Sequence, residues 1–354
     1  MRIAAAIAAL LIWCAAGPAA ADDGGAGDAT LPQTWPLVLL AQGDALLASA
    51  PARPGDPNEG ASLRLRRVRA GEDLTGRSFR VRLVLEAQSA DAAGEHFAPV
   101  EGGRLAGPLR VTEAFASWRP HRAFHADAGA IAVPFSLTRQ IDEADLRLPE
   151  RSVLAQTLAP DFRVGAGIGG DLGALAYAAA VMSASRFLDG DLFDRGALVA
   201  VRLAAEPIGP VGVTPWRRAP DDVWTDWFRF RHGVSFLYGT LYEAKSIGGG
   251  MDFSAQWRRI SATSEYILVH APSGNQQGAA VEPGASLIAR RLDVAARGEW
   301  ERAAGANGWG AGGALTFYAK DPRARLQAGF ERHTGPRPLG AATTALARLT
   351  FTID

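Results

Sequence analysis

The sequence predicts an all-β protein, a transmembrane antiparallel β-barrel of about 16 strands, within a range of roughly 14 to 18. Apolar and polar side chains alternate in segments that approach the roughly 9–11 residues with which a tilted strand crosses a bilayer. After the first residues, no apolar stretch approaches the roughly 20 residues of a membrane helix. An apolar exported chain without such a helix can still satisfy its backbone in lipid as a closed barrel.

The amino terminus has the pattern of a secretory signal. Arg2 is followed by a short apolar run that Gly17-Pro18 interrupts, and Ala19-Ala20-Ala21 then supplies small residues for cleavage. We therefore predict a signal peptide over residues 1–21, a flexible tail over 22–34 and the barrel over 35–354. Cys14, the only cysteine, lies in the predicted signal, so the exported chain has no disulfide or cysteine ligand.

The clearest strand covers residues 79–88. A period of two places successive side chains on opposite faces of a sheet, and the arginines and glutamate of one face need water or a charged partner. The apolar face has Phe79, Val81, Leu83, Leu85 and Ala87, and the other has Arg80, Arg82, Glu86 and Gln88, with Val84 the exception.

The same alternation recurs later in the chain, and turn signals separate the segments. The repeats begin at Met251, Leu292, Ala324 and Ala345, and residues 284–301 are compatible with one long strand or two short ones. Aromatic residues near strand ends are expected to form interfacial girdles. They are Trp118, Trp227, Phe228, Tyr266, Trp300, Phe317 and Tyr318.

One motif in the chain suggests other chemistry. Gly165, Gly167 and Gly170 match the G-x-G-x-x-G pattern of dinucleotide-binding proteins. The segment before them is short and charged rather than an apolar buried strand, so a strand–turn–strand is the better interpretation. The six histidines show no metal-ligand spacing. We predict no enzyme activity, no cofactor and no metal site.

Strand phasing places many arginines on the polar face, which in a barrel lines the channel. Guanidinium groups there could bind passing anions, or they could pair with lumenal carboxylates such as Glu86, Glu113, Asp252, Glu265 and Glu299. The zero formal charge leaves both alternatives open and gives no support to nucleic-acid binding. These channel-lining candidates are Arg64, Arg66, Arg80, Arg82, Arg163, Arg258, Arg297, Arg325 and Arg348.

Residues 62–170 contain a recognisable series of motifs. They are an arginine-rich strand at 62–69, Glu113-Ala114-Phe115, Val133-Pro134-Phe135, Glu150-Arg151-Ser152 and the strand opening at Arg163. In combination these motifs resemble the phosphate-selective porin O and P family. The resemblance implies an outer-membrane barrel of about 16 strands, usually a homotrimer, that passes anions by diffusion. It also implies that the loop from Ser136 to Pro160 lies near the channel mouth or folds inward. Arg139, Arg147 and Arg151 are then candidate anion contacts.

Together these observations predict a passive porin in the outer membrane of a Gram-negative bacterium, for small hydrophilic solutes that are neutral or anionic, such as phosphate. Its expected partners are outer-membrane lipid and the solute. The alternative is a soluble periplasmic β-rich protein that binds a carbohydrate or an anion, and the third hypothesis is a secreted nucleotide-cofactor enzyme.

Overall fold

The structure is a computed structural model and describes residues 37–49, 60–88, 109–142, 145–184, 196–208, 227–241, 244–272, 274–288, 291–303, 305–319, 324–334 and 342–353. The predicted signal peptide and amino-terminal tail lie outside these residues. Among the described residues, no helix has the length and apolar character needed to cross a membrane.

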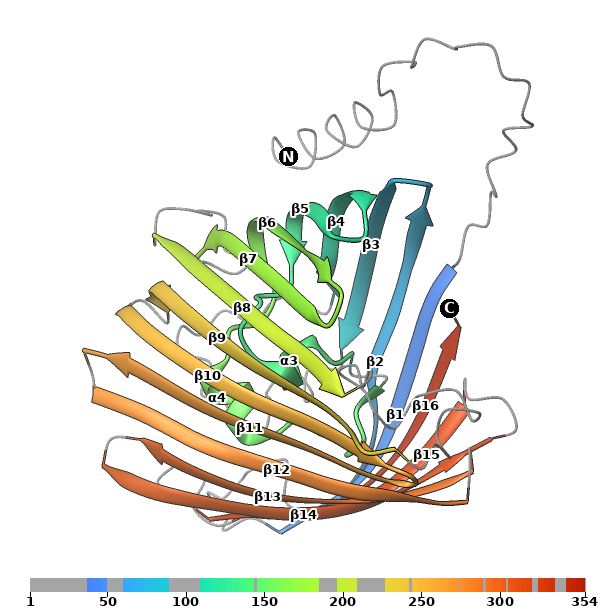
Figure 1. Ribbon diagram of the computed structural model, residues 1–354. Helices are drawn as coiled ribbons and strands as arrows, with labels where there is room; N and C mark the ends of the chain where they lie inside the picture. The colour runs from blue at the N-terminus through green and yellow to red at the C-terminus, as the bar shows by residue number, and fades with distance from the viewer. Residues whose placement is uncertain are drawn as a thin grey trace, which may run out of the picture.

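Sixteen antiparallel strands form one closed barrel, which confirms the predicted fold class (Figure 1). Closure is made by β1 and β16, with Leu39 opposite Ile353. Residues 284–301 belong to two strands, because β12 ends at Ile288 and β13 begins at Leu292. The strands are β1 (Leu37–Ser49), β2 (Gly60–Thr75), β3 (Phe79–Gln88), β4 (Leu109–His121), β5 (Phe124–Ile131), β6 (Arg163–Leu172), β7 (Leu175–Ser183), β8 (Ala197–Ile208), β9 (Arg229–Leu241), β10 (Ala244–Trp257), β11 (Ile260–Ala271), β12 (Gly274–Ile288), β13 (Leu292–Ala303), β14 (Ala306–Tyr318), β15 (Ala324–Thr334) and β16 (Ala342–Ile353).

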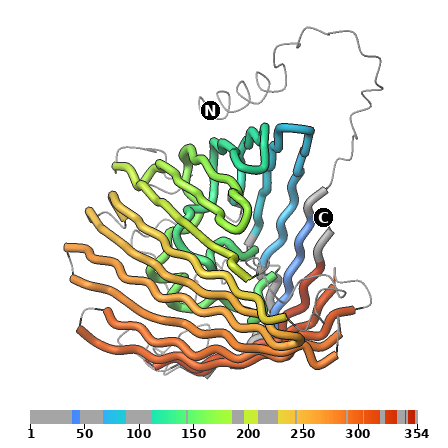
Figure 2. The backbone as a smooth tube through the Cα atoms, viewed as in Figure 1, coloured from blue at the N-terminus to red at the C-terminus, as the bar shows by residue number. Residues whose placement is uncertain are grey.

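The two ends of the barrel differ, and we name them by the chain termini. The terminal end is the one where β1 begins and β16 ends. Because neighbouring strands are antiparallel, odd-numbered strands run away from the terminal end and even-numbered strands run toward it. The strands are strongly tilted, as the tube in Figure 2 shows, which is the geometry that closure of a twisted sheet requires.

The predicted two-sided character of the strands is confirmed. In β3, Leu83 and Leu85 are exposed on the outer surface, whereas Val84 and Glu86 are completely buried inside. The strands that begin at Ala324 and Ala342 alternate in the same way, with Leu326 and Leu349 outside and Gln327 and Arg348 inside. An exposed apolar outer face of this kind suits contact with lipid.

Two local features differ from the phase that the sequence suggests. A β-bulge between β1 and β2 places Arg67 opposite Gln42, so that Arg67 is on the buried inner face. Tyr318 was predicted to join an aromatic girdle but points inward, where its hydroxyl donates a hydrogen bond to Asp293 at 3.2 Å. Trp118 and Phe317 are exposed outside as expected.

The glycine motif at 165–170 lies within a β-hairpin. β6 and β7 pair directly from Gly165–Met182 to Leu172–Leu175, and Gly173 takes a positive φ of 71° in the turn. The helix that a dinucleotide-binding unit needs after the glycines is replaced by strand β7, so the nucleotide-cofactor hypothesis is wrong.

Met251 tests the outer face, because it is 62% exposed at the middle of β10. We expect Met251→Arg to destabilise the folded barrel in lipid vesicles by about 2–4 kcal/mol, the cost of a guanidinium at the bilayer midplane. Urea titration followed by the folded and unfolded bands on a gel measures this cost, with Met251→Leu as the control. Equal stability of the two variants would argue against a lipid-facing surface here.

Candidate functional site in the barrel lumen

The chain between β5 and β6 folds into the barrel and forms the central feature of the lumen. The described part of this internal segment, residues 132–142 and 145–162, contains the short helices α3 (Leu137–Gln140) and α4 (Val153–Leu158). Both helices lie within the ring of strands in Figure 1. The inward alternative for the loop from Ser136 to Pro160 is therefore the one that the structure adopts.

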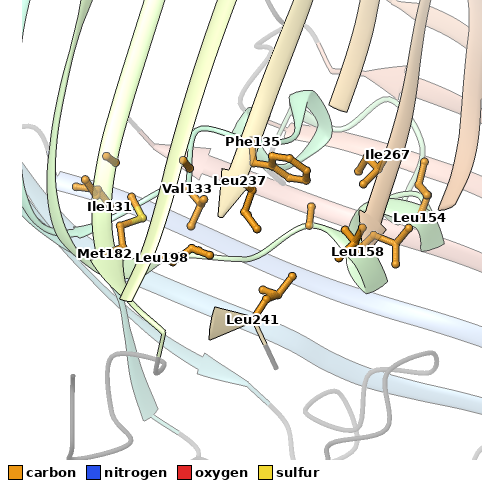
Figure 3. Close-up of a cluster of buried hydrophobic side chains, with 14 of the residues drawn as sticks. Ile131, Val133, Phe135, Leu154, Leu158, Met182, Leu198, Leu237, Leu241 and Ile267 are labelled. Atoms are coloured by element: carbon orange, nitrogen blue, oxygen red, sulfur yellow. The ribbon is translucent and has the colours of Figure 1, made fainter. Parts of the chain in front are cut away.

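Apolar packing holds one side of the internal segment against the barrel wall. Phe135, Leu154 and Leu158 are buried in a cluster with inward-facing side chains of β7 to β12 (Figure 3). Each fully buried side chain of this size contributes about 1.5–3 kcal/mol when it leaves water. The wall residues of the cluster are Ile131 at the end of β5 and, on β7 to β12, Ala180, Met182, Leu198, Ala200, Leu237, Leu241, Ile267, Val269 and Ala280.

Two carboxylates from the wall cap the two helices. Glu265 on β11 accepts hydrogen bonds from the backbone N–H and the hydroxyl of the first turn of α3, with Leu137 N at 2.8 Å and Thr138 Oγ1 at 2.8 Å. Glu299 on β13 accepts one from Val153 N at the start of α4, at 2.9 Å. The first N–H groups of a helix lack partners within the helix, and a carboxylate is favourable there.

The stretch from Leu146 to Glu150 is held through its backbone carbonyls. Arg325 donates to Leu146 O at 3.0 Å, and Arg297 donates to Glu150 O at 2.6 Å. Arg348 donates to Pro149 O and also pairs with the Glu150 side chain at 2.7 Å. The segment is therefore attached to β13, β15 and β16 by polar groups, and Leu148 of the same stretch packs against Ala295 of β13 and Ala314 of β14.

The three arginines of the segment have their donors directed at protein acceptors. Arg139 donates to Ala155 O at 3.1 Å and to Gln156 O at 3.2 Å. Arg147 donates to Ser261 Oγ at 2.5 Å, and Arg151 donates to Thr138 O and to Ile141 O. Burial lowers the pKa of Arg147, and it lowers the pKa of Arg151 to about 10. The contacts of Arg147 and Arg151 fit a role in holding the shape of the internal segment.

The inward-facing arginines of β2 and β3 form ion pairs along the wall. The Glu86 carboxylate forms ion pairs with Arg69 at 2.5 Å and with Arg67 at 3.4 Å. Arg80 pairs with Asp73, and Arg82 bridges Asp73 at 3.0 Å and Glu113 at 2.7 Å. Of the two alternatives for the lumenal arginines, pairing with carboxylates is the arrangement found here, although Arg80 and Arg82 use Asp73 and Glu113 rather than Glu86.

The other arginine candidates on the strands are buried or paired with carboxylates wherever their side chains are described. Arg163 is buried at the start of β6, and Arg297 pairs with Glu282 and Glu331, both at 2.8 Å. Arg348 pairs with Asp44 at 2.8 Å, which links the closing strands. The side chains of Arg64 and Arg66 lie outside the described residues.

The prediction that Arg258 lines the channel is wrong. It lies in the two-residue turn between β10 and β11 with a positive φ of 52°, exposed to solvent. Its guanidinium lies over the Trp257 ring at 5.4 Å from the centroid. The strand ends one residue before it, so the alternation that reaches Trp257 does not continue.

Sequence reasoning missed the role of the buried group on β8 to β10. Arg202 pairs with Asp252 at 2.6 Å and approaches Phe135 O at 3.4 Å, so it holds the internal segment as well. Arg231 approaches Asp252 at 3.7 Å. The alternation of Arg202 with Val201 and Leu203 is the signal that could have found this group.

Solvent access to the inner wall is uneven. On β3 the Arg80 side chain is 27% exposed and Arg82 is 18% exposed, whereas Arg297 and Arg348 on the other side are each 2% exposed. On β5, His125 and Asp127 are also half-buried. The internal segment covers the wall from β7 to β16 and leaves polar side chains on β2 to β5 in contact with solvent.

Comparison with known proteins supports the fold at low sequence identity. No family model matches the chain, and no curated protein matches it. Among solved structures, an anion-selective porin from Comamonas acidovorans has a TM-score of 0.58 at 9% identity and covers 90% of this chain and 98% of its own. OprB from Pseudomonas putida has a TM-score of 0.59 at 9% identity, covering 90% and 94%. OmpT of Vibrio cholerae, in a trimer form, has 0.56 at 10%, covering 89% and 98%.

The two caps make a direct test of how the segment is held. We expect Glu265→Ala to loosen α3, because the buried donors of Leu137 and Thr138 lose a charged acceptor at a cost of about 1–3 kcal/mol. Single-channel recordings should then show a larger and noisier conductance than the wild type.

Asp127→Asn is the matched control, because Asp127 faces the lumen and pairs with His125 rather than with the segment. Its conductance should be steady. An unchanged recording for Glu265→Ala would contradict the anchoring role of the wall carboxylate.

Proposed function

We propose that this protein is an outer-membrane porin, a passive diffusion channel for small hydrophilic solutes. The observation that carries the proposal is a closed barrel with an exposed apolar outer face and a charged inner face. The internal segment fills part of its lumen. A closed barrel of about this strand number encloses an aqueous channel. The exposed apolar face disfavours a soluble binding protein, since such a surface would be insoluble without lipid or detergent.

The solute path runs along the inner wall of β2 to β5, beside the internal segment. The half-buried Arg80, Arg82 and Asp73 lie there beside the buried Glu113, and Asp142 of the segment approaches Arg69 at 3.6 Å from the opposite side. Groups of both signs therefore face the path. Polar lining of this kind replaces the hydration of a small solute without binding it tightly.

The ionic selectivity of this path is expected to be weak. Each of Arg69, Arg80 and Arg82 is within ion-pair distance of a carboxylate, so its charge is largely compensated. The whole chain has 37 basic and 37 acidic side chains, and a field without net sign gives little preference for either ion. Phosphate and other anions would pass as members of a broad class of small solutes.

We further propose that the chain works without catalysis, in the outer membrane and as a homotrimer. The similarity to barrels of outer-membrane proteins supports the location, and the trimer form of one of them supports the assembly. Membrane fractionation and cross-linking of the detergent-solubilised protein test these two statements.

Planar-bilayer recording tests the function itself. We expect discrete conductance steps from the purified protein and, in a tenfold salt gradient, a reversal potential close to zero. Protein that is folded by gel migration but gives no steps would refute the channel. A strongly anion-selective potential would instead support the alternative in which the arginines act as anion sites.

Arg80 is the residue with which to test the position of the path. Arg80→Gln should leave conductance within about twofold of the wild type and move the reversal potential toward cation preference, because Asp73 loses its main counter-charge. Arg302→Gln removes the same charge from the outer face and should change neither quantity. An Arg80 variant identical to the wild type would place the path elsewhere in the lumen.

A further inference from the structure

The charged groups of the solute path lie at successive levels of the inner wall of β2 to β5, which are neighbours in the barrel (Figure 1). Inward positions recur along a strand about every 6.7 Å, so the levels from Glu86 to Arg80 span roughly 20 Å of the path. Each level has groups of both signs. From the end opposite the termini, the levels are Glu86 with Arg69, Arg82 with Asp73, and Arg80 with Asp127. We call these groups, together with Glu113, the mixed-charge row.

Opposite charges in the mixed-charge row are close enough to contact one small molecule together. The Arg82 guanidinium is 2.7 Å from the Glu113 carboxylate and 3.0 Å from the Asp73 carboxylate. Asp142 of the internal segment is 3.6 Å from Arg69, so a carboxylate also approaches the row from the opposite side. A solute that carries both an ammonium and a carboxylate can therefore meet a partner for each of its groups at every level.

The mixed-charge row is in contact with solvent, unlike the charges that hold the internal segment. Arg80 and Arg82 are partly exposed and the Asp142 side chain is 36% exposed, whereas Arg297 and Arg348 are almost completely buried. Ion pairs in contact with water are weak, because solvent screens their attraction. A passing solute can therefore replace one partner of such a pair without a large cost.

The glycine-rich strand β6 lies beside the mixed-charge row. Its consecutive inward positions are Gly165, Gly167 and Gly169, and Gly167 is paired with Asp127 of β5. A Cβ at Gly169 would lie 2.7 Å from the His125 ring, so the glycine leaves that ring its place on the wall. These three positions add no hydrogen-bonding side chain that could compete with a solute for the charges of the row.

A solute with a single charge gains less from the mixed-charge row than a solute with two opposite charges. An anion that approaches Arg82 also approaches Asp73 and Glu113, which lie within 3.0 Å of that guanidinium. A cation that approaches Asp73 likewise meets Arg80 and Arg82. In both cases a repulsion of similar range opposes the attraction. A zwitterion avoids this conflict, because its two ends turn toward groups of opposite sign.

We propose that the path favours small zwitterions of the α-amino acid class over anions, cations and neutral solutes of the same size. The carboxylate of the solute accepts hydrogen bonds from Arg80 or Arg82, and its ammonium donates to Asp73, Glu113 or Asp142. Binding is weak and repeats at each level, so it concentrates the solute in the path without trapping it. The inference rests on the proposed diffusion channel and names the solute class of the same path.

Efflux of isotope-labelled solutes from proteoliposomes at neutral pH tests the proposal, with rates corrected for liposomes without protein. The probes share a three-carbon skeleton: serine is the zwitterion, glycerate the anion, serinol the cation and glyceramide the neutral solute. The path variant is Arg82→Gln with Glu113→Gln, which removes one charge of each sign and leaves Asp73 paired with Arg80. The control variant is Arg122→Gln with Asp171→Asn, which removes an exposed ion pair at the terminal end.

We expect the wild type and the control to release serine about threefold faster than each of the other probes, and the path variant to lose most of this preference. Serine efflux no faster than glyceramide efflux from the wild type would overturn the proposal, and this comparison holds even if the path variant does not fold. Fastest efflux of glycerate would overturn it in favour of an anion path, and an unchanged preference in a folded path variant would overturn the role of the mixed-charge row. Discrete conductance steps from the same wild-type preparation show that the channel itself works, so a missing serine preference then refutes only the zwitterion inference, whereas missing steps refute both.

Discussion

The pairing of β1 with β16 is the constraint on which the structure depends. In lipid, an unpaired edge strand would leave a row of backbone N–H and C=O groups without partners, at several kcal/mol each. Closure removes both edges, and with them the need for any other element to cover the sheet. The Asp44–Arg348 ion pair, with oxygens 2.8 and 3.0 Å from the guanidinium, lies on the inner face of this seam. It joins strands that are far apart in the sequence, and Arg348 extends the link to the internal segment through Glu150.

Closure also means that the internal segment needs its own hydrogen-bond partners inside the barrel. A chain that enters the lumen brings backbone groups that the strands cannot pair, so each stretch of the segment needs its own partners. Glu265 and Glu299 receive the N–H groups of the two helices, and wall arginines donate to the carbonyls between them. Phe135, Leu154 and Leu158 meet an apolar part of the wall that lies mainly on β7 to β12, and Leu148 meets Ala295 of β13 and Ala314 of β14. The division of the wall into apolar and polar parts thus sets the side on which the segment lies, and the solvent-accessible part of the wall follows from that.

The arginines of the chain serve two environments. Inside, they are paired with carboxylates or directed at carbonyls, because a buried cation without partners is costly. On the outer surface, cations such as Arg302 can remain unpaired within the protein because headgroups and water are available to them. Counting arginines therefore says little about ion preference, since the sign of the field in the lumen depends on which carboxylates lie beside them.

The sequence by itself determined the barrel, the outward and inward faces of β3, β15 and β16, and the hairpin nature of the glycine-rich segment. These follow from a period of two and from the length of each alternating run, both of which are local properties. Only the tertiary structure decided that Arg67 faces inward, since a bulge depends on the partner strand. It also decided that Arg258 lies in a turn and that Arg151 is directed at the carbonyls of its own segment. The pairing of Arg82 with Glu113, and of Glu265 with α3, depends on strand register and on the path of a loop. Neither leaves a periodic trace in the sequence, because both join residues that only the closed barrel brings together.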